Sequence, residues 1–146
     1  MKALLFYGPG EYELKEVPKP TPGQGDILLR VKAAGSDIRM IFNGYRGVSH
    51  ETPRIYGHEI AGIVEEVGSD VADAGYRPGD AVAVAPNMGC GVCDMCVSGN
   101  THLCPEYKAF GINMDGGFAE YVVVPEIAVR QGNLVKIAID ENMSFA

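Results

Sequence analysis

The spacing of the cysteines is the feature that most constrains how this chain folds. All four lie in 90-CGVCDMCVSGNTHLC-104, in the pattern Cys-x2-Cys-x2-Cys-x7-Cys. Two-residue gaps allow successive sulfurs to point at one centre, where thiolates bind zinc tetrahedrally at about 2.3 Å. Because four protein ligands leave no open position for water, a zinc ion at these residues would be structural. The predicted ligands are Cys90, Cys93, Cys96 and Cys104.

We expect this ion to fold a surface lobe at about residues 87–106. The segment has too few large apolar side chains to fold alone, and zinc-binding free energies of ~10–16 kcal/mol are ample for that purpose. His102 also lies in the lobe, where a Cys3His site is conceivable, but with four cysteines available we expect this imidazole to face solvent.

Two other interpretations of the cysteine cluster remain. Disulfides across two-residue gaps would be strained, and a reducing compartment disfavours them. An iron–sulfur cluster is suggested by Pro105 after Cys104, because the bacterial ferredoxin run ends in Cys-Pro. In that run the last gap is three residues and its final cysteine serves a second cluster, whereas here the gap is seven and no second set of cysteines exists. A protein that absorbs visible light would revive the iron–sulfur interpretation.

Charge and hydropathy exclude some classes of partner. The chain has 12 basic and 19 acidic residues, a formal net charge of -7 and a pI near 4.9, so nucleic acids and anionic membrane surfaces would repel it. No apolar stretch approaches the length that spans a bilayer, and the N-terminal MKALLFYGPG is too short in apolar residues for a signal peptide. The sequence therefore predicts a cytoplasmic protein that binds neither nucleic acid nor membrane.

Short β-branched runs between turn residues predict a mainly β fold. With 19 glycines and nine prolines, the 146 residues divide into brief segments that suggest one domain with a barrel or sandwich. Only Asp37–Asn43 is typical of a short helix. The expected strands are Lys2–Tyr7, Tyr12–Val17, Ile27–Ala34, Ile60–Val67, Ala81–Ala85, Phe118–Val124 and Leu134–Ile137.

A second candidate site lies in 57-GHEIAGIVEEVG-68. Imidazole and carboxylate are both zinc ligands, and His58 and Glu59 precede an alternating apolar and polar run that predicts a strand. Taken alone, a His-Glu pair is more often an ordinary surface pair than a metal site.

The order of the motifs adds a family resemblance. Gly-His-Glu-x2-Gly-x-Val is followed by a Pro-Gly-Asp turn at Pro78–Asp80, by the cysteine cluster and by 115-DGGFAEYVVVP-125. In this order the chain resembles the zinc-containing medium-chain alcohol and polyol dehydrogenases, especially the sorbitol, threonine and butanediol dehydrogenase branch. The resemblance covers essentially the whole chain.

The resemblance implies a GroES-like, partly open β-barrel at residues 1–146, with a few short helices and the zinc-binding lobe. In the family this catalytic domain is followed by a Rossmann domain that binds NAD or NADP. This sequence has no Gly-x-Gly-x-x-Gly, so we expect it to end before that domain. By resemblance, hydride passes between nicotinamide and a small secondary alcohol or polyol, His58 is a catalytic-zinc ligand, and Glu59 is a carboxylate at or beside that zinc. A homo-oligomer is compatible with the resemblance.

The stretch 31-VKAAGSDIRM-40 departs from the family pattern. There the strand runs into Gly-Ile-Cys-Gly-Ser-Asp, whose Cys binds the catalytic zinc and whose Ser begins a proton relay. Aligned from the helix side, Ser36 keeps the relay hydroxyl and Ala34 replaces the Cys; aligned from the strand side, Asp37 takes the Cys position. A carboxylate can bind zinc, so an Asp37-His58-Glu59 site is conceivable, weak or vacant. Either alignment predicts a turn at Ala33–Asp37 that is shorter than in the family.

Two functions follow from these patterns. The first is the zinc-binding catalytic domain of an NAD(P)-dependent alcohol or polyol dehydrogenase, inactive in isolation and carrying one structural zinc. The alternative is a stand-alone β-barrel, stabilised by zinc, that serves as a scaffold or interaction module without catalysis. Two zinc ions and nicotinamide-dependent alcohol oxidation would exclude the scaffold.

Overall fold

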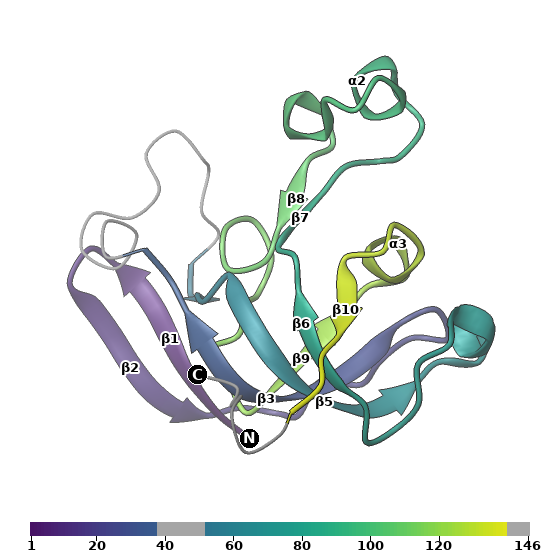
Figure 1. Cartoon of the computed structure of the whole chain (residues 1–146). Coiled ribbons are helices and arrows are strands. Elements are labelled where there is room, and N and C mark those ends of the chain that lie inside the picture. Colours follow the sequence, from purple (N-terminus) through teal and green to yellow (C-terminus); the bar gives the residue numbers. More distant parts are fainter. Residues whose placement is uncertain (38–51, 140–146) are drawn as a thin grey trace.

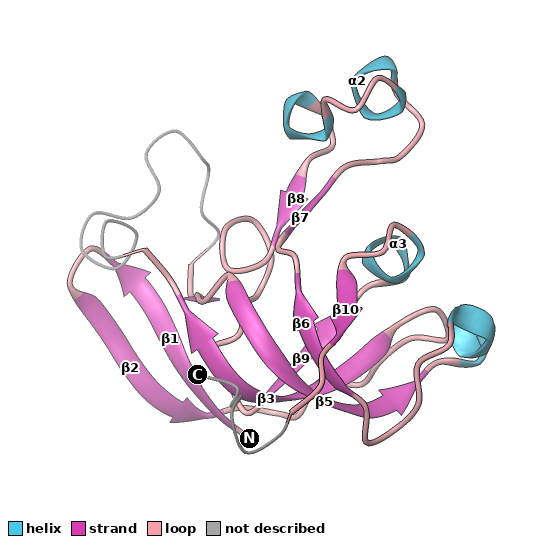
Figure 2. Ribbon diagram, viewed as in Figure 1, coloured by secondary structure: helices cyan, strands magenta, loops and turns pink. Residues whose placement is uncertain are grey.

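The computed structural model describes residues 1–37 and 52–139, and these residues contain ten strands arranged in three sheets (Figures 1 and 2). The largest sheet has five antiparallel strands in the order β10-β6-β5-β3-β9. These strands are β3 (Ile27–Gly35), β5 (Glu59–Val67), β6 (Ala81–Val84), β9 (Tyr121–Val124) and β10 (Leu134–Lys136).

Alternation of apolar and polar residues explains why one face of this sheet is buried. In β5, Ile60 and Val64 are 5% and 1% exposed, whereas Glu65 on the neighbouring position is exposed to solvent. The inward side chains of the five strands form one hydrophobic core, whose buried members include Ile27, Leu29, Val82, Val84, Phe110, Val122, Val124 and Leu134.

A second sheet closes part of the barrel. Its order is β2-β1-β4, from β1 (Lys2–Gly8), β2 (Glu11–Glu16) and β4 (Arg54–Ile55). Ala3 in β1 forms a bridge with Ala119, just before β9, and the Leu4 N–H donates to the Phe118 carbonyl at 2.8 Å. These contacts join the two sheets, and the expected mainly β, GroES-like fold is confirmed.

The third sheet is the base of a lobe that stands away from the barrel (Figure 1). It pairs β7 (Asn87–Met88) with β8 (Lys108–Ala109), and between them lie α2 (Asp94–Val97) and a 3-10 helix, η2 (Thr101–Leu103). The other helices are the 3-10 helix η1 (Ser69–Ala74) and α3 (Glu126–Arg130). The longest helix in the described residues has six residues, so none of them could traverse a bilayer.

All seven expected strands are confirmed, with ends that shift by one to three residues. The strands β4, β7 and β8 were not predicted, because two residues carry no periodicity. The four helices were also missed, since each has only three to six residues. Of the helix expected at Asp37–Asn43, residues 38–43 lie outside the described residues. The predicted shortening of the Ala33–Asp37 turn therefore stays a prediction.

The Asp80 carboxylate in the Pro78–Asp80 turn makes the stability of the fold depend on pH. The Asp80 carboxylate accepts a hydrogen bond from Lys136 Nζ at 2.7 Å and one from the Arg77 N–H at 2.9 Å, and these lower its pKa from the ordinary value of 3.8. A lowered pKa means that the folded state favours the charged carboxylate. Its contribution to stability is therefore complete above the ordinary pKa and is lost as pH falls through the lowered value.

We expect the free energy of unfolding to fall more between about pH 6 and about pH 3 in the parent chain than in Asp80→Asn. Urea denaturation at several pH values measures both curves. The effect should be small because the ion pair lies at the surface. Two parallel curves would show that this carboxylate does not contribute to acid sensitivity.

Candidate functional site

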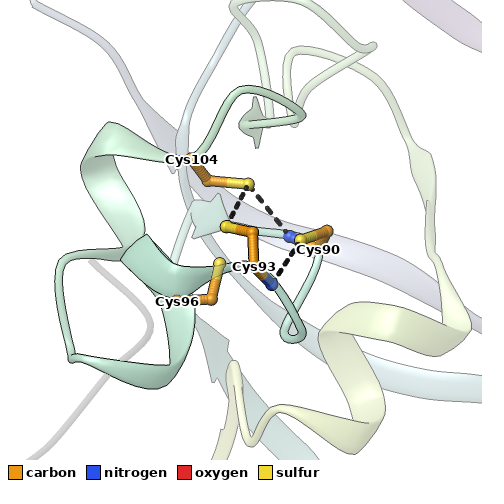
Figure 3. Close-up of side chains that lie close together, drawn as sticks. All are labelled: Cys90, Cys93, Cys96 and Cys104. Atoms are coloured by element: carbon orange, nitrogen blue, oxygen red, sulfur yellow. Dashed lines mark hydrogen bonds between the residues drawn. The ribbon is translucent and has the colours of Figure 1, made fainter.

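The lobe brings the four cysteines together at its centre (Figure 3). Cys90 follows β7, Cys93 is the N-cap of α2, Cys96 lies within that helix and Cys104 ends the 3-10 helix η2. Two very short helices, α2 and η2, therefore turn the chain so that the four cysteines face one another. His102 is exposed, as we expected.

Distances between the sulfurs fit one tetrahedral metal ion. All four Sγ atoms lie within 4.8 Å of one another, and the Sγ atoms of Cys93 and Cys104 are 3.8 Å apart. A tetrahedron with bonds of about 2.3 Å to zinc has edges of about 3.8 Å. Disulfide sulfurs are about 2.0 Å apart, and all four cysteines are free thiols. The four sulfurs therefore lie close enough together to hold one metal ion.

Backbone N–H groups point at two of the sulfurs (Figure 3). The Cys93 N–H donates to Cys90 Sγ at 3.3 Å, and Cys104 Sγ accepts from the N–H groups of Cys90 and Glu106, each at 3.3 Å. The N–H groups of Val92 and Cys93 lower the pKa of the Cys90 thiol to about 7. Such donors stabilise thiolates, which are the form that binds metal.

The pKa of the Cys96 thiol is shifted in the opposite direction to that of Cys90. The Gly91 N–H lowers the pKa of Cys96, but burial and the other three thiols oppose it and raise this pKa to about 11. Four thiolates at this distance repel one another, so a bound cation is the group that would stabilise all of them together.

Gly89 allows the backbone to approach the sulfurs closely. It is buried, and a Cβ atom at this position would lie 2.5 Å from Cys96 Sγ and 3.2 Å from the Cβ of Cys104. Any larger residue would therefore push the cluster apart. Sequence reasoning missed this glycine, although its position directly before the first cysteine was the available signal.

The structure brings Ser36 and His58 together at the point where β3 ends and β5 begins. The His58 N–H donates to the Gly35 carbonyl at 3.0 Å, and Ser36 Oγ lies 3.5 Å from His58 Nδ1, at the outer limit of a hydrogen bond. Glu59 pairs with Gly35 in the β3–β5 ladder, and its carboxylate is exposed. A hydroxyl and an imidazole can exchange a proton when this distance shortens to about 3 Å or when one water bridges them.

A shallow groove of about 480 Å³ lies against the end of β3 and the start of β5. Among the described residues, Glu59 is its only charged lining residue, and the other described lining residues are Ala33, Ala34, Gly35, Ile60, Ala61, Ala83, Val84 and Pro86. A small, largely apolar molecule with one polar group would fit such a lining.

The described residues do not complete a metal site at His58. Within residues 1–37 and 52–139, the four cysteines are the only group of three or more His, Cys, Asp or Glu whose ligand atoms lie within 4.8 Å of one another. Asp37, His58 and Glu59 do not form such a group, and Ala34 offers no ligand atom. The Asp37-His58-Glu59 site therefore stays a prediction.

Gly57, which directly precedes His58, packs closely against the backbone of Gly111 and Gly116. A Cβ atom on Gly111 would lie 2.8 Å from the amide nitrogen of Gly57, and one on Gly116 would overlap the Gly57 carbonyl oxygen. The Gly117 N–H donates to that same oxygen at 2.7 Å. The Asp-Gly-Gly-Phe and Gly-His-Glu motifs, separate in the sequence, therefore support one another in the fold.

A partly open antiparallel barrel with a four-cysteine lobe and a Gly-His-Glu segment at its strand edge defines a GroES-like domain of the kind that zinc dehydrogenases contain. The family model of the alcohol dehydrogenase GroES-like domain matches residues 23–135. This chain belongs to that family, and its zinc-containing medium-chain dehydrogenase members are its relatives.

The relatives include whole dehydrogenases. The L-threonine 3-dehydrogenase of Pyrococcus furiosus is 42% identical over 129 residues, which cover 86% of this chain and 36% of the relative. The NAD-dependent alcohol dehydrogenase of Saccharolobus solfataricus is 45% identical over 121 residues, covering 77% of this chain and 34% of the relative. The chain thus spans about a third of the length of the curated relatives it matches.

Solved structures agree with this assignment. A crystal structure of an NAD-dependent alcohol dehydrogenase matches with a TM-score of 0.83 at 33% identity, covering 99% of this chain and 41% of that one. A cobalt- and zinc-bound thermostable alcohol dehydrogenase from Pyrobaculum aerophilum matches with a TM-score of 0.80 at 35% identity, covering 96% and 42%.

Proposed function

We propose that this chain is the substrate-side, zinc-binding domain of an NAD(P)-dependent alcohol or polyol dehydrogenase. The observation that carries the proposal is the placement of Ser36, His58 and Glu59 where β3 ends and β5 begins, with Glu59 lining an apolar groove. Family membership and the dehydrogenase relatives support it. The substrate would be a small secondary alcohol or polyol, and of the two the apolar lining of the groove favours the alcohol.

We also propose that Cys90, Cys93, Cys96 and Cys104 hold one structural zinc ion. The spacing of their sulfurs and the N–H donors around them support this role. With all four positions of the ion taken by protein, its contribution would be to fold the lobe.

The residues at the strand edge would handle the proton of the reaction. When hydride leaves an alcohol carbon, the hydroxyl proton must leave as well, and bound nicotinamide supplies the hydride acceptor. The Ser36 hydroxyl, 3.5 Å from His58 Nδ1, would pass this proton to the imidazole, and the exposed Glu59 carboxylate is a further acceptor beside the groove. NAD or NADP would bind to a cofactor domain outside residues 1–146.

One observation favours the alternative function, a zinc-stabilised barrel that serves as a scaffold. Within the described residues, His58 and Glu59 lack the third ligand that a metal site requires. In that case the lobe would still bind zinc, and the strand edge would have no catalytic role.

A fusion experiment separates the two functions. We expect the chain alone to contain about one zinc ion and to oxidise no alcohol with NAD or NADP. Fused to the cofactor-binding part of Pyrococcus furiosus L-threonine 3-dehydrogenase, it should oxidise small secondary alcohols, and His58→Ala should lower kcat at least about 100-fold. His102→Ala, at an exposed imidazole, is the matched control and should have no effect. A fusion that binds nicotinamide but oxidises no alcohol in a broad panel would favour the scaffold.

A further inference from the structure

Gln131 reaches from the barrel into the cysteine lobe. It directly follows α3, and its Nε2 donates a hydrogen bond of 2.8 Å to the carbonyl of Gly89. The same Nε2 would lie 3.0 Å from a Cβ atom placed on Gly91. The amide therefore lies against both neighbours of Cys90, the first cysteine of the cluster.

The peptide that Gln131 contacts is itself packed on the cluster. Gly89 is buried against Cys96 Sγ and the Cβ of Cys104. A movement of the Gly89 carbonyl would displace Cys90 along the chain and would also change the space available to Cys96. The hydrogen bond from Gln131 thus acts on the positions of several thiols, although Gln131 touches no sulfur.

The barrel holds the segment that carries Gln131 firmly. Ala128 and Val129 of α3 are 0% and 4% exposed and belong to the main core. Asn133, two residues later, is 7% exposed, and its Nδ2 donates to the carbonyls of Ala85 at 2.9 Å and Asn87 at 2.7 Å. One barrel segment therefore fixes the lobe at its base and again beside the first cysteine.

Beyond these contacts an open, polar groove of about 530 Å³ is lined both by Gln131 and Asn133 of the barrel segment and by lobe residues that include Cys96, Thr101 and His102. A lobe bordered by such a groove depends on specific hydrogen bonds for its position more than a closely packed one would.

We propose that Gln131 is a positioning residue for the metal centre, which holds the Gly89 carbonyl so that the thiols stay arranged for a tetrahedral ion. The inference rests on the proposed metal site at the four cysteines. Residues that orient metal ligands through hydrogen bonds typically contribute 10–100-fold to affinity, and we expect the lower end for an exposed amide.

The test is a cobalt titration of the metal-free chain, followed by absorption of the thiolate–cobalt complex and competition with a chelator. Gln131→Ala should bind cobalt roughly tenfold more weakly than the parent. Gln131→Glu should lose at least as much, because a carboxylate cannot donate to the Gly89 carbonyl and repels it. Gln24→Ala removes an exposed amide far from the lobe and should bind like the parent.

Thermal unfolding of each metal-free variant is measured in parallel. The proposal holds if both Gln131 variants lose affinity while their metal-free melting temperatures match that of Gln24→Ala. Parent-like affinity in both variants would overturn it while leaving the metal site intact. A parallel loss of metal-free stability would also overturn it, because Gln131 would then act on folding. A parent chain without the tetrahedral thiolate–cobalt spectrum would instead refute the metal site itself.

Discussion

Replacing Cys104 by serine should abolish stoichiometric metal binding and unfold the lobe at residues 87–106. Cys104 is 5% exposed, and its Sγ accepts hydrogen bonds from the N–H groups of Cys90 and Glu106. The same Sγ lies 3.8 Å from Cys93 Sγ. Structural zinc contributes ~10–16 kcal/mol in small domains, so weakening one of four bonds removes several kcal/mol that the lobe cannot replace. The measurements are zinc per chain after dialysis against a chelator and hydrogen exchange of the lobe amides.

Val97→Ser is the matched control. It also introduces serine into the lobe, one residue from Cys96, but at a position that is 70% exposed. This variant should retain about one zinc ion per chain and a protected lobe. Chelator treatment of the parent should reproduce the Cys104→Ser exchange pattern. If Cys104→Ser keeps both its zinc and its protection, the four-cysteine site is wrong.

The cysteine cluster shows what local spacing can predict. Gaps of two, two and seven residues are short enough for the sulfurs to converge whatever the rest of the fold does, and they lie within 4.8 Å of one another. The strands were predictable for a similar reason, since alternation in a segment such as β5 reports burial on one face. The partly open barrel followed from the family resemblance rather than from these local patterns.

Contacts between distant segments could not be predicted from spacing. Gln131 appeared as an ordinary residue after a short apolar run, and only the fold places its amide on the Gly89 carbonyl. The predicted catalytic residues depend on such contacts too. Ser36 and His58 meet because β3 pairs with β5. Asp37, the next residue after Ser36, is exposed. Ligands from separate strands need backbone positions that a motif does not encode.

The glycines around His58 lead to the second large effect: Gly116→Ala should destabilise the chain by about 3 kcal/mol. Its new Cβ would overlap the Gly57 carbonyl oxygen and lie 2.7 Å from both the Tyr56 carbonyl oxygen and the Cα of Gly111. These are backbone atoms, which cannot move aside as a side-chain tip does. The Gly116 N–H also donates to the Ile55 carbonyl at 2.8 Å, so relief of the overlap would break a hydrogen bond. Urea denaturation measures the loss.

Gly8→Ala separates this overlap from the general effect of adding a methyl group to glycine. At Gly8 the nearest atom to a new Cβ is Glu11 Oε2 at 3.8 Å, an ordinary contact, so stability should change by less than about 1 kcal/mol. Gly116→Ala should additionally shift the imidazole NMR signals of His58, because the displaced Gly57 carbonyl immediately precedes that residue. Equal stabilities for the two variants, with unchanged His58 signals, would mean that the Asp-Gly-Gly-Phe segment does not position the candidate catalytic histidine.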